Sequence, residues 1–145
     1  MSWLRPTFFL LYSNELFSCG IHFISMSKKT LVIGASNNPD RYAYKAVKKL
    51  TAYGHPVLAL GKKEEMIDAI PVVKERPLDT DIDTVTLYVN PQLQKNYYDY
   101  LLNLHPKRII FNPGTENDEL AELAQQKGIQ TLEACTLVLL SIGDY

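Results

Sequence analysis

Short apolar runs alternate with amphipathic stretches along this chain from Lys28 onward. The runs are rich in β-branched residues and have the length of strands that are buried on both faces of a sheet. They lie at 30–34, 56–60, 84–89, 108–112 and 129–133, with a shorter candidate at 70–73. Because helical patterns separate most of the runs, the order of elements predicts a mainly parallel sheet covered by helices.

Three of the intervening stretches carry apolar residues at helical spacing. The first ends at Gly54, the second follows Asn90 as N-cap and Pro91 as first helical residue, and the third stops at Lys127 and Gly128. The three apolar stripes are Ala43, Ala46, Val47 and Leu50; Leu93, Tyr97, Tyr100, Leu101 and Leu104; and Leu120, Leu123 and Ala124.

The order of these elements predicts a single α/β domain with a Rossmann-like, doubly wound sheet and helices on both faces. Right-handed crossovers make the chain reverse direction between the first strand and the strand at 84–89. Ligands of such folds bind beyond the carboxyl ends of the strands, at that reversal. The stretches in which to look for a site are therefore 34–41, 61–63, 90–91, 112–117 and 135–136.

Composition narrows the function classes. The chain has 145 residues, enough for one hydrophobic core, and its net charge of -1 provides no global field that would hold nucleic acid. Cys19 and Cys135 lie far apart and fit neither a disulfide framework nor a zinc site, which suits a reducing cytosol. The three histidines are scattered as well. We therefore expect a cytoplasmic protein without a metal site and without a nucleic-acid partner.

Residues 1–25 differ in character from the rest, since they are aromatic, nearly uncharged and without a clear period. The apolar run at 8–12 is too short to span a bilayer, and Asn14 and Glu15 interrupt the pattern of a signal peptide. One interpretation is a start assigned too far upstream, with the domain beginning at Met26 and residues 1–25 dispensable. The other is a real extension that packs on the domain or on a membrane.

The turn after the first strand reads G-A-S-N-N-P and contains the first candidate residues, Gly34, Ala35, Ser36 and Asn37. Gly34 permits a tight bend, and the donors of Ser36 and Asn37 can then face an anion near a helix start. A dinucleotide fingerprint would have its second glycine where Ser36 stands, which disfavours NAD. Arg41 can act as a charged clamp on a phosphate. The alternative is ordinary turn residues followed by an exposed helix arginine.

A second candidate group follows the second strand, which ends in Gly61, Lys62 and Lys63. Dinucleotide sites carry an acidic residue here for the ribose hydroxyls, whereas lysines favour a phosphorylated ribose. Both NADP, with its 2'-phosphate, and coenzyme A, with its 3'-phosphate, meet that requirement. A solvated run of charges on a loop is the alternative.

Taken together, these segments resemble the small stand-alone CoA-binding proteins related to the N-terminal domain of the succinyl-CoA synthetase α subunit. The resemblance rests on "VIGASNNPDRYAYKAVKKL", "VNP", "FNPGTEN" and "GIQTLEACTLVLL", and it extends from Lys28 to the end of the chain. One departure is the second strand, which in many relatives ends in a Val-Asn-Pro-like turn and here ends in Leu-Gly-Lys-Lys.

The resemblance implies roles for the candidate residues. Gly34, Ser36 and Arg41 would hold the pyrophosphate side of coenzyme A, and Lys62 and Lys63 would lie by the adenosine 3'-phosphate. The cleft would be lined by Val89, Asn90 and Pro91, and the pantetheine end would be flanked by Pro113, Gly114 and Glu116.

Catalytic signatures are weak in this sequence. The ligase relatives use a phosphorylated histidine on a second domain and an ATP-grasp partner, neither of which fits into this length. Ser36 does not stand in a nucleophile elbow. Cys135 is the one candidate reactive group, because a thiol beyond the last strand could meet the CoA thiol, although a small buried cysteine is the more common case.

The sequence thus predicts a protein that binds coenzyme A or an acyl-CoA as a carrier, sensor or accessory protein without a reaction of its own. An NADP-linked oxidoreductase, or another nucleotide-dependent enzyme, is the alternative, because Lys62 and Lys63 would suit its phosphorylated ligand equally well. An interaction module with a vestigial cleft is a third.

Overall fold

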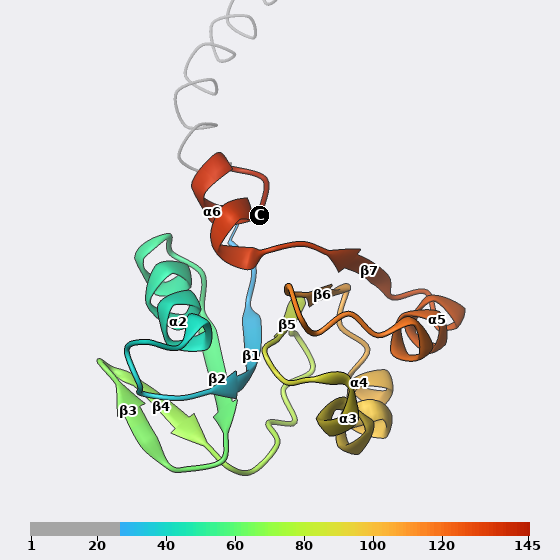
Figure 1. The fold of residues 1–145 in the computed structure, drawn as a ribbon, viewed down its shortest axis with the longest axis horizontal. Coiled ribbons are helices and arrows are strands. Elements are labelled where there is room, and N and C mark those ends of the chain that lie inside the picture. Colours follow the sequence, from blue (N-terminus) through green and yellow to red (C-terminus); the bar gives the residue numbers. More distant parts are fainter. Residues whose placement is uncertain (1–26) are drawn as a thin grey trace, which may run out of the picture.

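A seven-stranded sheet runs through the computed structural model, which describes residues 27–145 (Figure 1). Its order is β3-β4-β2-β1-β5-β6-β7, and all neighbouring strands are parallel except β3 and β4. The strands are β1 (Thr30–Ala35), β2 (Val57–Gly61), β3 (Glu65–Ile67), β4 (Ile70–Val73), β5 (Thr84–Leu87), β6 (Arg108–Phe111) and β7 (Gln130–Glu133).

The chain builds the sheet outward from β1 in two directions. It first adds β2 and the β3–β4 hairpin on one side of β1, and then adds β5, β6 and β7 on the other side. The reversal between β1 and β5 is the one predicted from the order of elements. The Rossmann-like, doubly wound α/β fold is therefore confirmed.

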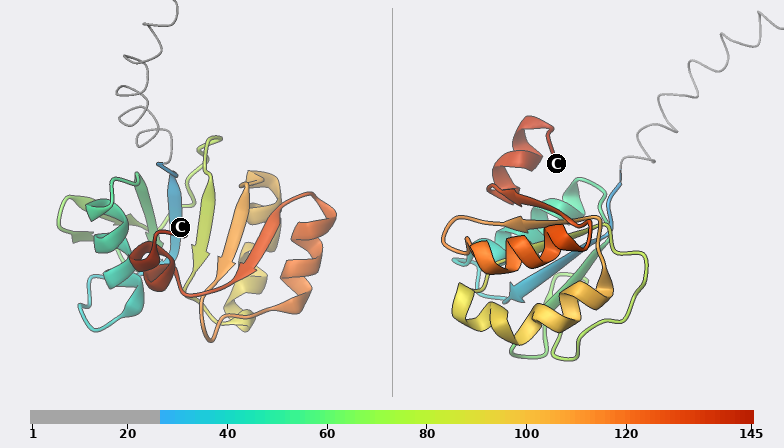
Figure 2. Two further views of the ribbon diagram at one scale, coloured as in Figure 1. Left: turned by 90° about the horizontal axis from the view of Figure 1, so that it is seen from above. Right: turned by 90° about the vertical axis from the view of Figure 1, so that its right-hand side faces the viewer.

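Helices cover both faces of this sheet (Figure 2). On one face, α2 (Tyr42–Ala52) and α6 (Thr136–Ile142) share a core cluster with the sheet, to which they contribute Val47, Leu50 and Leu140. On the other face, α4 (Tyr98–Leu104) and α5 (Asp118–Gln126) contribute Leu101 and Leu120 to a second cluster.

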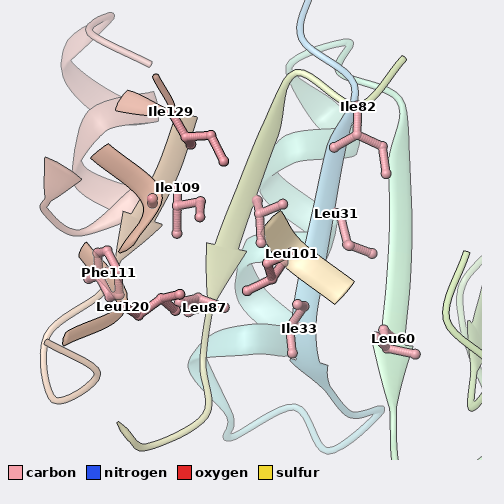
Figure 3. Close-up of a cluster of buried hydrophobic side chains, with 12 residues drawn as sticks. Leu31, Ile33, Leu60, Ile82, Leu87, Leu101, Ile109, Phe111, Leu120 and Ile129 are labelled. Atoms are coloured by element: carbon pink, nitrogen blue, oxygen red, sulfur yellow. The ribbon is translucent and has the colours of Figure 1, made fainter. Parts of the chain in front are cut away.

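Because both faces are covered, the central strand β1 is apolar at successive positions. Leu31 and Ile33 of β1 point into the cluster beneath α4 and α5, where Figure 3 shows them with Leu101 and Leu120, whereas Val32 points into the cluster beneath α2. Burial on both sides removes the alternation of polar and apolar residues that a half-exposed strand would show.

The structure also differs from the predictions in several places. The expected strand at 84–89 ends at Leu87, and the expected helix through 93–104 is divided into α3 (Pro91–Gln94), the 3-10 turn η1 (Lys95–Tyr97) and α4. Strand β3 and helix α6 were not predicted. Three residues are too few to show a period, and the apolar run at 137–140 does not distinguish a helix from a strand.

None of the helices within residues 27–145 combines the length and apolar character that crossing a membrane requires. The two interpretations of residues 1–25 concern a segment that lies outside the described residues, and they stay predictions.

A polar cluster closes the end of the sheet at which the parallel strands begin, here called the amino edge. The predicted site lies at the opposite end, where these strands finish, here called the carboxyl edge. The side chain of Arg108 is 9% exposed and donates from Nε to Thr84 Oγ1 at 2.7 Å. Its guanidinium lies 4.4 Å from the ring centre of Tyr145, whose hydroxyl is hydrogen-bonded to Thr30 Oγ1. The ring of His55 lies 4.9 Å from that of Tyr145. Helix α6 is thereby linked through Tyr145 to the starts of three strands.

His55 gives this edge a predicted pH dependence. Its Nδ1 accepts a hydrogen bond from the backbone N–H of Lys28 at 2.9 Å, so the ring is neutral in the folded protein. Burial, and then the charges of Lys28 and Arg108, lower the pKa of His55 below its ordinary value, while Asp83 opposes this shift. The unfolded chain therefore takes up the proton more readily, and stability is lost as the pH falls through the ordinary histidine range.

We expect the free energy of unfolding to decrease between about pH 7.5 and pH 5. His55→Asn should flatten this decrease, because an amide oxygen can replace Nδ1 as an acceptor without titrating. His105→Asn serves as the control, since it removes an exposed imidazole at the end of α4 and leaves the cluster around Tyr145 intact. Urea unfolding at several pH values measures both; an unchanged slope in His55→Asn would contradict the assignment.

Candidate functional site

The carboxyl ends of β1, β5 and β2 approach one another so closely that two positions have no room for a side chain. Gly34 has φ +98°, and a Cβ there would lie 3.0 Å from Val89 Cγ1 and 3.1 Å from the backbone of Tyr88. A residue with a Cβ would be strained both by its backbone angle and by this contact. Gly34 therefore lets β1 pass directly against the segment that follows β5.

Gly61 has the same role between β1 and β2. A Cβ at Gly61 would lie 2.2 Å from the carbonyl oxygen of Ala35, which is too close for any atom pair of this kind. The register between the two strands shifts between Ile33 and Ala35, around Gly34. The side chain of Ala35 packs in the core cluster beneath α2. Gly34 and Gly61, both residues of the predicted site, thus shape the backbone from which the loops leave the sheet.

Hydrogen bonds between nearby residues hold the loop between β1 and α2. Ser36 Oγ accepts from the backbone N–H of Asn38 at 3.1 Å, and Asn38 Oδ1 accepts from that of Asp40 at 3.0 Å. The N–H of Arg41 in turn donates to the carbonyl oxygen of Asn38 at 3.0 Å. The loop is thus an ordered turn that leads into α2.

Three cationic side chains lie on the loops at this edge. Arg41 is the N-cap residue of α2, whose first turn contains no acidic residue, and Lys62 and Lys63 follow β2. All three are exposed, and among residues 27–145 none of them takes part in an ion pair. Their charges are therefore available to an anionic ligand.

The loops after β5 and β6 are joined through Gln94, a fully buried residue at the end of α3. Its Nε2 donates to the carbonyl oxygens of Val89 at 2.9 Å and Thr115 at 2.7 Å, and its Oε1 accepts from Asn117 Nδ2 at 2.8 Å. As predicted, Asn90 caps α3, accepting from Leu93 N–H at 2.9 Å, and Pro91 is the first helical residue. Val89, Asn90 and Pro91 are thus fixed relative to the loop after β6.

A second buried amide, Asn112, connects β5, β6 and α6. Its Nδ2 donates to Thr86 Oγ1 at 2.6 Å and to the carbonyl oxygen of Leu87 at 2.9 Å, and its Oδ1 accepts from the backbone N–H of Thr136 at 2.9 Å. The hydroxyls of Thr86 and Thr136 are bonded to each other at 2.8 Å. The sequence predicted that 112–117 lies at the site but assigned no role to Asn112 itself. A polar residue directly after an apolar strand was the available signal.

Cys135 is brought to the middle of this edge although it follows β7, the outermost strand. After β7 the chain returns across the carboxyl edge, where Ala134 N–H donates to the carbonyl oxygen of Phe111 at 3.1 Å, and α6 then packs beside α2. Cys135 is the N-cap residue of α6 and is half-buried. Burial raises the pKa of Tyr88, so the Tyr88 phenol stays neutral. Its buried oxygen has no hydrogen-bond partner among the described residues.

The turn after β6 contains the remaining predicted residues, Pro113, Gly114 and Glu116, all of which are exposed. Gly114 has φ +91°, and its N–H donates to Glu116 Oε1 at 2.9 Å. Thr115, between them, is buried and donates from Oγ1 to the carbonyl oxygen of Asn112 at 2.8 Å. Glu116 therefore has a structural partner within its own turn.

Within residues 27–145, no group of three or more His, Cys, Asp or Glu side chains is placed to hold a metal ion. Besides the Glu116 carboxylate, the carboxyl edge offers backbone donors, exposed cations and one half-buried thiol. Such a set can bind a phosphorylated ligand by hydrogen bonds and charge.

Asn112→Ala should lower the free energy of unfolding by about 2–4 kcal/mol, because it leaves the Thr136 N–H, the Leu87 carbonyl and the Thr86 hydroxyl without this partner in a buried place. Asn103→Ala, on the exposed side of α4, is the matched control and should change stability by less than about 0.5 kcal/mol. Urea denaturation of both variants measures the difference. Equal stabilities would show that water replaces the Asn112 side chain at no cost.

Comparison with solved structures gives the same fold. One crystal structure, of an uncharacterized protein, is 47% identical with a TM-score of 0.80; the match covers 82% of this chain and 98% of that one. A hypothetical protein from Pyrococcus horikoshii OT3 is 26% identical with a TM-score of 0.69, covering 81% of this chain and 84% of its own. A conserved hypothetical protein from Pyrococcus furiosus is 25% identical with a TM-score of 0.68, covering 77% and 97%.

No curated protein matches this chain significantly in sequence. The family model described as a CoA binding domain matches residues 28–141. This range contains all seven strands of the sheet and every loop at its carboxyl edge. The chain therefore belongs to the CoA-binding domain family.

Proposed function

We propose that this protein binds coenzyme A or an acyl-CoA at the carboxyl edge of its sheet and acts as a non-catalytic carrier, sensor or accessory protein. The observation that carries the proposal is that the CoA-binding family model spans the whole sheet together with the loops of that edge. A cytosolic location, suggested by the two widely spaced cysteines, is part of the same proposal.

In this proposal the first loop takes the pyrophosphate. Gly34 keeps the loop close to the sheet, Ser36 and Asn37 lie where the chain leaves it, and the exposed guanidinium of Arg41 supplies a charge-assisted donor. The start of α2, a helix of 11 residues, adds positive partial charge.

The adenosine 3'-phosphate and the pantetheine arm would use the remaining loops. Lys62 and Lys63 are exposed cations beyond β2, on the side of β1 away from β5, which suits the adenosine half. The pantetheine arm would then extend toward β5 and β6, along residues 89–91 and 113–116 and toward Cys135.

A binding role without catalysis is supported by the positions of the histidines. His55 and His105, the two within the described residues, precede β2 and β6 and lie at the amino edge, away from the proposed ligand. No imidazole of residues 27–145 is therefore at hand for acid–base chemistry at the carboxyl edge. An NADP-linked oxidoreductase would need a proton donor beside the nicotinamide, a role that histidine fills most often.

A panel of ligands tests the proposal directly. Coenzyme A and acetyl-CoA should raise the melting temperature, whereas NADP, NAD and FAD should not; a ligand at 100 times its dissociation constant adds about 2.7 kcal/mol to stability. Stabilisation by NADP without stabilisation by coenzyme A would favour the oxidoreductase, and no response to any ligand would favour an interaction module.

We expect coenzyme A to bind more tightly than 3'-dephospho-CoA at low salt and the difference to disappear at high salt. Charges at an exposed site are screened over roughly 8 Å at physiological ionic strength. Replacing both Lys62 and Lys63 by Ala should abolish the difference, whereas Lys127→Ala, which removes an exposed charge after α5, should leave it intact. Titration calorimetry measures these affinities, and equal affinities of the wild type for both ligands at low salt would remove the role of the lysines.

Arg41 and Cys135 should differ in how much they contribute to the affinity for coenzyme A. Arg41→Ala removes a charge-assisted donor and should weaken coenzyme A binding by about 1.5–3 kcal/mol, whereas Cys135→Ser should alter the affinity little. Mass spectrometry after incubation with CoA disulfide checks for covalent chemistry, since an adduct on Cys135 that is absent from Cys135→Ser would indicate a reactive thiol. Normal binding by Arg41→Ala would overturn the assignment of Arg41.

A further inference from the structure

A carboxylate already occupies one of the backbone donors of the proposed pyrophosphate loop. The N–H of Asn37 donates to Glu65 Oε2 at 3.1 Å, and the two residues are 28 positions apart in the sequence. Asn37 is exposed and Glu65 is half-buried, so this donor faces the outside of the protein. Glu65 is not among the residues that the sequence suggested.

The geometry of β3 explains how Glu65 reaches this loop. Glu65 and Ile67 point to the same face of the strand, and Ile67 is buried in the core cluster that contains Val47 of α2. The β3–β4 turn is also tied to α2 by the Lys48–Asp68 ion pair at 3.3 Å. The α2-facing side of β3 is therefore held against α2, and the Glu65 carboxylate lies next to the loop that precedes this helix.

The loop has hydrogen bonds of its own besides the one to Glu65. They run from Asn38 to Ser36 Oγ, from Asp40 to Asn38 Oδ1 and from Arg41 to the carbonyl of Asn38, so Glu65 is not the only support of the loop. The carboxylate of Glu116, by contrast, bonds only within its own turn, to Gly114 N–H. Glu65 is thus an anion brought from a separate element to a backbone donor that the loop presents outward.

We infer that Glu65 is an affinity-setting residue, an internal carboxylate that competes with the ligand's pyrophosphate for the Asn37 N–H. The inference rests on the proposed function. One N–H cannot serve two anions at full strength, and a carboxylate beside a pyrophosphate repels it. A ligand that binds this loop must displace Glu65, and binding is weaker than the loop alone would allow. Because the bond is exposed, the displaced carboxylate regains water and the displacement is readily reversible.

Glu65→Gln isolates this competition. Glutamine keeps the shape of the side chain and an oxygen acceptor for Asn37 N–H, and it removes only the charge. Relief of a like-charge contact near 4 Å in a solvated place corresponds to about fivefold tighter binding of coenzyme A. Glu64→Gln removes the same charge one residue away, where the exposed side chain makes no hydrogen bond or ion pair within residues 27–145, and should change the affinity less than twofold.

Calorimetry with two ligands separates Glu65 from the proposed lysine site. Coenzyme A and 3'-dephospho-CoA share the pyrophosphate, so Glu65→Gln should tighten both by the same factor, and the gain should shrink as salt is raised. If Glu65 instead pre-organised the loop, Glu65→Ala would weaken binding and Glu65→Gln would leave it unchanged. That result, or an equal effect of Glu64→Gln and Glu65→Gln, would overturn the inference.

Inorganic pyrophosphate gives a readout that does not depend on coenzyme A. In amide NMR spectra, the Asn37 N–H signal should move on titration with pyrophosphate, and the midpoint should fall at a lower concentration in Glu65→Gln than in the wild type. Competition at Asn37 without coenzyme A binding would sink the proposed function and keep the inference. Coenzyme A binding that is insensitive to Glu65→Gln, together with an unchanged pyrophosphate midpoint, would sink the inference alone.

Discussion

The close approach of three backbones at Gly34 and Gly61 is the constraint on which the rest of the carboxyl edge depends. With a Cβ at either position, β1 could not pass against Tyr88 and Val89 or pair with the end of β2 as it does. Since β1 is the central strand from which the sheet grows in both directions, these contacts set where the loops on either side of the reversal start. A ligand that spans the reversal would meet loops placed by this packing.

Buried amide side chains complete the arrangement. Gln94 and Asn112 together satisfy four backbone groups, the carbonyls of Val89, Thr115 and Leu87 and the N–H of Thr136. Their other hydrogen bonds are to the side chains of Asn117 and Thr86. The exposed side chains of Arg41, Lys62 and Lys63, on the other loops, take part in no ion pair within residues 27–145, so their charges are available to a ligand. Rigid loops with unengaged cations suit recognition of a phosphorylated ligand at low entropic cost.

The two edges of the sheet use their polar residues differently. At the amino edge, the side chains of Arg108, His55 and Tyr145 pack together and against the first residues of the strands. Their polar groups therefore stabilise the fold. At the carboxyl edge, backbone donors and cations face outward, and Glu65 shows that an anion is accepted there. Helix α6 connects the two edges, since its first turn is bonded to Asn112 and Tyr145, which follows soon after its end at Ile142, lies on Arg108.

The sequence by itself determined the class of fold, because burial on both faces makes β1 and β6 apolar at successive positions and because Asn90–Pro91 and Gly128 mark helix ends whatever surrounds them. It also located the loops of the candidate site. What only the tertiary structure decided are the contacts between elements distant in the chain: Gly61 against Ala35, Asn112 with Thr136, Thr86 with Thr136, and Glu65 on Asn37. Each depends on the order of strands and on strand register, which bring residues together at distances that no local pattern encodes.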